Sequence, residues 1–126
     1  MSSTKRVLRP YRIIDGGNMN ASITSPETNT QFLDYCLLQI EWNGTTPIGV
    51  VNFEYLELEK DRNSTGLDVW GKLNFGGLVG TDIPISENTG SHTIIITELS
   101  FPRIRVSYVK TSGIGTITTT LFAKER

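Results

Sequence analysis

The chain has 126 residues, of which 37% are hydrophobic and 20% are charged, and its formal net charge is −1 at pH 7. This length predicts one domain, and the balance of apolar and charged residues excludes a disordered polypeptide. No apolar run approaches the roughly 20 residues that cross a bilayer, so we expect no membrane partner. The first residues lack the apolar core of a signal peptide, and we expect a product that is made in a cytoplasm and not secreted.

Basic residues gather at the beginning of the chain. Residues 1–12 contain four cationic side chains and no acidic one, so this segment carries +4 and the remainder carries −5. A basic segment on a mildly acidic body either docks on an acidic surface or remains a solvated tail. Four scattered cations with a single aromatic neighbour are too few to indicate nucleic-acid binding. The candidate partner contacts are Lys5, Arg6, Arg9, Tyr11 and Arg12.

The first quarter of the chain is polar and shows no helical periodicity. Residues 1–30 are rich in Ser, Thr, Asn and Gly, and 15–18 has the composition of a turn. Only residues 12–14 have the character of a short edge strand. We predict an extended N-terminal arm over residues 1–30, which folds back along a sheet edge or reaches a neighbouring subunit. One domain follows over residues 31–126.

The domain shows the period-two alternation of half-buried strands. Cys36, Leu38, Ile40 and Trp42, for example, are spaced to share one face of a strand. The predicted strands run from Tyr35 to Trp42, from Ile48 to Glu59, from Leu67 to Phe75 and from Ile83 to Ile85, with three more between Ser91 and Lys124.

Glycine-containing turn signals separate these strands. Residues 43–47 begin with Asn-Gly, a strong hairpin signal, and residues 111–115 contain two glycines. Both segments are therefore predicted to be turns between strands. Six to eight strands with turns at this spacing predict an all-β fold, an antiparallel β-sandwich of jelly-roll or immunoglobulin-like type.

Candidate catalytic and metal-binding residues are few. Cys36 lies in an apolar strand, where a free thiol is a small buried hydrophobe. His92 has no second His and no Cys partner for zinc, and the acidic residues between 57 and 61 lack the spacing of a calcium loop. No catalytic, cofactor or metal site is expected, and the chain is predicted not to be an enzyme.

Three aromatic residues allow two interpretations. Trp42, Trp70 and Tyr108 could line a sugar-binding face, or they could fill the core as aromatic residues of sandwiches commonly do. The core interpretation is favoured.

Two segments resemble small virion structural proteins of tailed bacteriophages. Arg103 to Tyr108, Thr111 to Ile117 and Phe122 to Lys124 are similar to the C-terminal hairpin of those proteins, in which a strand ending in Tyr meets a Thr-Ser-Gly-x-Gly-Thr turn. Gln39 to Gly49 resembles their first hairpin, where a strand with Trp leads to a Gly-Thr turn.

The resemblance implies a non-enzymatic protein of the virion. Our leading hypothesis is a capsid decoration or cement protein that assembles as a homo-oligomer and binds the shell through its N-terminal arm and sheet edges. The alternatives are another virion position, such as a vertex, head–tail or tail-tip component, and a carbohydrate-binding β-sandwich for host attachment.

Overall fold

The protein is described by a computed structural model that covers residues 8–31, 33–60, 64, 66–72, 82–96 and 102–125. These residues form antiparallel strands, which confirms the predicted all-β class. The described ranges contain no helix with the length and hydropathy that membrane crossing requires. The strands are β1 (Arg9–Asn18), β2 (Ile23–Thr24), β3 (Thr28–Asn29), β4 (Leu33–Leu58), β5 (Val69–Lys72), β6 (Asp82–Ile85), β7 (Thr89–Ile96) and β8 (Arg103–Glu125).

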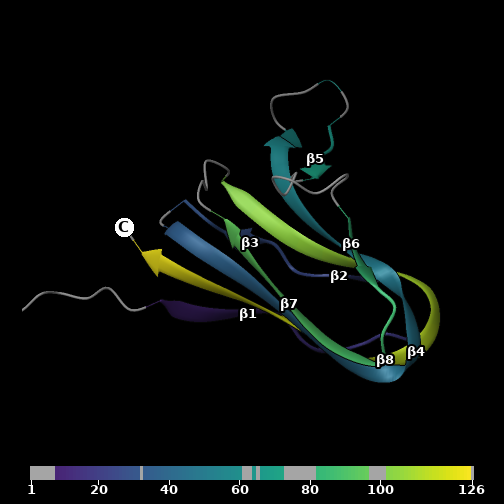
Figure 1. Cartoon of the computed structure of the whole chain (residues 1–126). Coiled ribbons are helices and arrows are strands. Elements are labelled where there is room, and N and C mark those ends of the chain that lie inside the picture. Colours follow the sequence, from purple (N-terminus) through teal and green to yellow (C-terminus); the bar gives the residue numbers. More distant parts are fainter. Residues whose placement is uncertain are drawn as a thin grey trace, which may run out of the picture.

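Two long paired strands, β4 and β8, are the central strands of the fold. They pair antiparallel from Leu33 opposite Glu125 to Tyr55 opposite Ile104. Figure 1 shows that they lie side by side and turn back together at one end of the molecule. The shorter strands pair with the flanks of this bent ribbon.

The bend divides one hydrogen-bonded sheet into two halves. In the β1/β7 half, the order is β1, residues 114–125 of β8, residues 33–45 of β4, and β7. In the β3/β5 half, β2 and β3 flank residues 103–112 of β8, while β5 and β6 flank the second part of β4. The hydrogen bonds therefore join all eight strands in a single sheet.

The two segments predicted as hairpin turns form the corner of the ribbon instead, so the hairpin prediction is wrong. Gly44 pairs with Gly115 across the corner, and Thr45 pairs with Ile114. Thr46 and Gly113 take up the bend with φ values of 45° and 86°. Each strand continues through the corner because its partner strand bends with it, and neither reverses onto itself.

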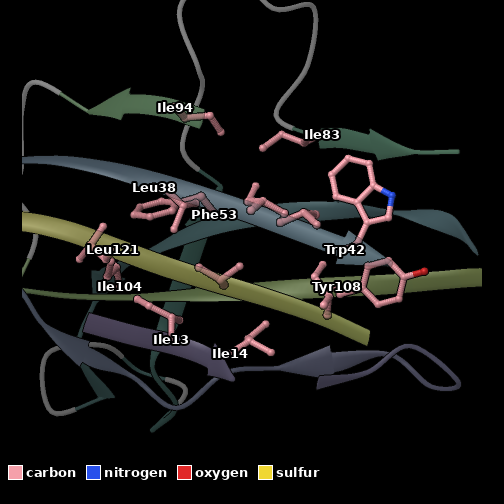
Figure 2. Close-up of a cluster of buried hydrophobic side chains, with 14 of the residues drawn as sticks. Ile13, Ile14, Leu38, Trp42, Phe53, Ile83, Ile94, Ile104, Tyr108 and Leu121 are labelled. Atoms are coloured by element: carbon pink, nitrogen blue, oxygen red, sulfur yellow. The ribbon is translucent and has the colours of Figure 1, made fainter. Parts of the chain in front are cut away.

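The core lies between the two halves of the bent sheet. The alternation predicted from the sequence is confirmed: Leu38, Ile40, Val51 and Phe53 are each fully buried on β4. Figure 2 shows Leu38 and Phe53 meeting side chains from β1, β6, β7 and β8 in one cluster. The further core residues from those four strands are Ile13, Ile14, Ile83, Ile85, Ile94, Ile104, Val106, Tyr108, Ile117, Leu121 and Ala123.

Much of the segment predicted as an arm is part of the sheet. β1 pairs with β8, and the register shift between Arg12 and Ile14 turns both Ile13 and Ile14 inward. Threonines of β8 satisfy backbone donors that the irregular pairing frees: the Ile14 N–H donates to Thr119 Oγ1 over 3.1 Å. Thr119 is fully buried, and this bond satisfies its hydroxyl oxygen.

Candidate functional site

The candidate functional surface is the side of the β1/β7 half that points away from the core, which we call the outer face. Strand alternation places on it the side chains that point away from the core. Most of them are small or amide-bearing polar groups. They are Arg12 on β1, Thr116, Thr118 and Thr120 on β8, Gln39, Glu41 and Asn43 on β4, and Thr89, Ser91 and Thr93 on β7.

Two adjoining depressions mark the middle of the outer face. One of about 550 Å³ lies between β4, β7 and β8, and one of about 410 Å³ reaches β1. They share Gln39, Glu41 and Thr118 as lining residues. Both are open to solvent and rich in hydroxyl and amide groups, so this surface offers many hydrogen-bonding groups to a partner but no enclosed chamber.

One end of the outer face is apolar. The register aligns Pro10, Phe122, Leu37 and Ile95 in a row across four strands, which we call the apolar row. Ile95 is 61% exposed, and Leu37 and Phe122 are half-buried. Neighbouring side chains in such a row lie roughly 5 Å apart. The apolar row is therefore a continuous, partly exposed hydrophobic strip that includes the start of β1.

The structure describes three of the five predicted partner contacts, Arg9, Tyr11 and Arg12, all on β1. Arg12 lies on the outer face, where its Nη1 is 3.4 Å from Asp15 Oδ1. Tyr11 packs against the core, and Arg9 is exposed at the beginning of β1. The other two candidates, Lys5 and Arg6, lie outside the described residues.

The three aromatic candidates do not share an exposed face. Trp42 is only 9% exposed, and its Nε1 donates to the Glu87 carbonyl oxygen over 2.8 Å. Tyr108 is fully buried, and this burial raises the pKa of its hydroxyl. Trp70 lies on β5 in the other half of the sheet. Trp42 and Tyr108 are thus part of the core, as the favoured interpretation predicted.

A charged cluster that the sequence did not reveal covers the outside of the β3/β5 half. Arg105 Nη2 lies 3.3 Å from Glu54 Oε2, and its guanidinium carbon lies 4.1 Å from the centre of the Trp70 ring. Ser107 Oγ donates to Glu54 Oε1 over 2.7 Å. Alternation predicted the outward direction of Arg105, but its partners come from strands remote in sequence. These contacts hold β5 against β4 and β8.

The remaining candidate residues do not come together in a catalytic or metal-binding group in the described part of the chain. His92 is exposed on β7, and Cys36 is fully buried among core residues. Within the described ranges, no three His, Cys, Asp or Glu side chains come together as a metal-binding group. Asp61, one member of the acidic run, lies outside those ranges.

Burial of Cys36 leads to a prediction about alkaline stability. Burial raises the pKa of its thiol to about 12, whereas an unfolded thiol has a pKa of about 8.5. Between these values the unfolded chain releases a proton that the folded chain keeps. The free energy of unfolding should therefore fall as pH rises, by up to about 1.4 kcal/mol per pH unit from this group.

Urea denaturation of the wild type and of Cys36→Ala between pH 8 and pH 11 measures this effect. The alanine variant lacks the thiol and should therefore lose less stability over that range. The alkaline titration of Lys and Tyr is common to both proteins and cancels in the comparison. Parallel curves for the two proteins would show that the thiol titrates normally in the folded state.

Comparison with known proteins adds no relative. No family model matches the chain, and no curated protein is significantly similar to it. The function must therefore be inferred from the residues and from their arrangement in the sheet.

Proposed function

We propose that the protein is a non-enzymatic structural component of a virion, and that it decorates or cements a capsid shell. The observation that carries this proposal is the apolar row beside the beginning of β1. Pro10 of the row is adjacent in sequence to Arg9, and Arg12 follows it on the outer face. A hydrophobic strip with a cation, Arg12, on the same face suits a protein surface that is itself apolar at its centre and acidic around it.

We propose that the residues before β1 also contribute to binding. Residues 1–8 precede β1 directly, and their cations Lys5 and Arg6 add to those of β1. β1 is an edge strand of the described sheet, pairing with β8 alone. A shell protein that bound the apolar row would therefore also meet the beginning of β1.

We also propose that the folded-over sheet is a β-sandwich of jelly-roll type. Both halves direct their apolar side chains into one core, and the ribbon of β4 and β8 passes through both. Small sandwiches of this kind present broad faces and sheet edges, which suits assembly in many copies. The segments that resemble phage virion proteins in sequence lie in β4 and β8, where they form the corner of this ribbon rather than hairpins.

The first test locates the protein in purified virus particles whose genome encodes it. We expect it to cosediment with particles in many copies and to be labelled by specific antibodies over the head. Labelling at a vertex or on the tail would place it elsewhere in the virion. Its absence from the particles would overturn the virion proposal.

The binding surface is tested with matched charge variants on particles stripped of the protein. Arg9→Gln/Arg12→Gln lowers the net charge by two beside the apolar row and should weaken binding, most clearly at low salt. Thr24→Glu/Thr111→Glu lowers the net charge equally at exposed positions of other strands and should bind like the wild type. Removal of residues 2–7 tests Lys5 and Arg6 in the same assay.

A further inference from the structure

Four of the described edge segments carry features that prevent their pairing with another chain. β2 and β3 have two residues each, and β5 has four with an irregular register. β6 has four residues, and its Pro84 has no N–H to donate. Short strands and proline are known means of protecting sheet edges.

The long edge strand β1 is protected as well. It carries Arg9, Arg12 and Asp15, and its pairing with β8 shifts register twice. Charged side chains and bulges both disfavour the addition of a further strand.

β7 has none of these features. Its eight residues, Thr89–Ile96, pair with β4 from Asn43 to Cys36 without a register shift. The strand contains no Asp, Glu, Lys, Arg or Pro. β4 is the strand that pairs with it in the described sheet, and no described strand pairs with the alternate N–H and C=O groups on its other side.

We propose that β7 is a self-association edge, and that two copies of this chain pair through it in antiparallel orientation about a two-fold axis. The strand has no charged residue, so two copies meet without like-charge repulsion, and the whole chain carries a net charge of only −1. A strand paired with its own copy forms a closed, isologous contact, which ends at a dimer. A strongly charged partner strand would find no complementary charge on β7.

The side chains along this edge also suit pairing with themselves. Ser91, Thr93 and Ile95 are exposed on the outer face, and hydroxyl and β-branched pairs across antiparallel strands are favourable. Pairing would join two outer faces into one continuous surface and would bring two apolar rows onto it. The inference rests on the proposed function, which calls for assembly in many copies, and extends it by naming the edge through which two copies pair. The test below uses no particles, so either proposal can fail alone.

Sedimentation velocity over a concentration series tests the dimer. Pairing of one edge is smaller than the roughly 1,200–2,000 Å² of a standard interface, so we expect a concentration-dependent equilibrium between monomer and dimer. Thr93→Lys should raise the dimer dissociation constant at least about tenfold, because two lysines come together near the axis. A wild-type protein that stays monomeric throughout the series would overturn the proposal.

Two further variants distinguish edge pairing from face-to-face stacking of the copies. Thr116→Lys makes the same change on the outer face but on β8, so it should keep the dimer. If it abolishes the dimer while Thr93→Lys does not, the copies stack face to face and the proposal is wrong. Thr93→Glu alone should also be monomeric, and an equal mixture with Thr93→Lys should restore the dimer. A folded but non-associating mixture would also refute β7 pairing.

Discussion

A chain that begins at Gln31 is expected to lose its cooperative folding transition. Removal of residues 1–30 takes away β1, β2 and β3, which all pair with β8. It also removes Ile13, Ile14 and Met19, which are at most 7% exposed in the folded protein. Burial of each such side chain contributes about 1.5–3 kcal/mol, and a domain of this size has roughly 5–15 kcal/mol in total.

Circular dichroism and urea denaturation of the two chains make the comparison. The control is a chain without residues 2–7, which keeps all of β1 and should unfold at a urea concentration close to that of the full chain. A chain starting at Gln31 that unfolds as cooperatively as the full protein would show that the core forms without β1. The result also bears on binding experiments, because loss of binding after the longer truncation would reflect unfolding.

The strand faces could be predicted from the sequence because alternation is a local property. Leu38 and Ile40 face inward for the same reason that Gln39 and Glu41 face outward: successive residues of a strand point to opposite sides. β1 breaks this rule at its register shift, where Ile13 and Ile14 both turn to the core. The polar composition around them, and the distant threonines that satisfy the backbone, concealed a strand within the predicted arm.

The corner and the outer face could not be predicted because they depend on partners remote in sequence. Asn43 and Gly44 have the composition of a hairpin turn, but the strand continues since Gly115 and Thr116 pair with them. The apolar row has the same origin. Leu37 and Phe122 come together only through the register of β4 and β8, and neither side chain stands out as a contact residue in the sequence.

Replacement of Gly113 by alanine should be among the most destabilising single changes at the corner. Gly113 has a φ of 86°, and a Cβ atom there would collide with the Thr46 carbonyl oxygen and would lie 2.6 Å from the Pro47 Cα. The left-handed backbone costs a non-glycine residue about 1–2 kcal/mol, and overpacking adds about 1–3 kcal/mol. We therefore expect the free energy of unfolding to fall by roughly 2–5 kcal/mol for Gly113→Ala.

Gly16→Ala is a matched control, because Gly16 also has a positive φ, of 62°, but no atom lies within 4 Å of a Cβ built there. It should lose only the backbone contribution of about 1–2 kcal/mol. The difference between the two variants in urea denaturation measures the close approach of the two strands at the corner. Equal losses would mean that β4 and β8 separate there at little cost. A larger loss for Gly113→Ala would show that the bend is held by backbone packing between the strands, and that the two halves of the sheet depend on one tight contact.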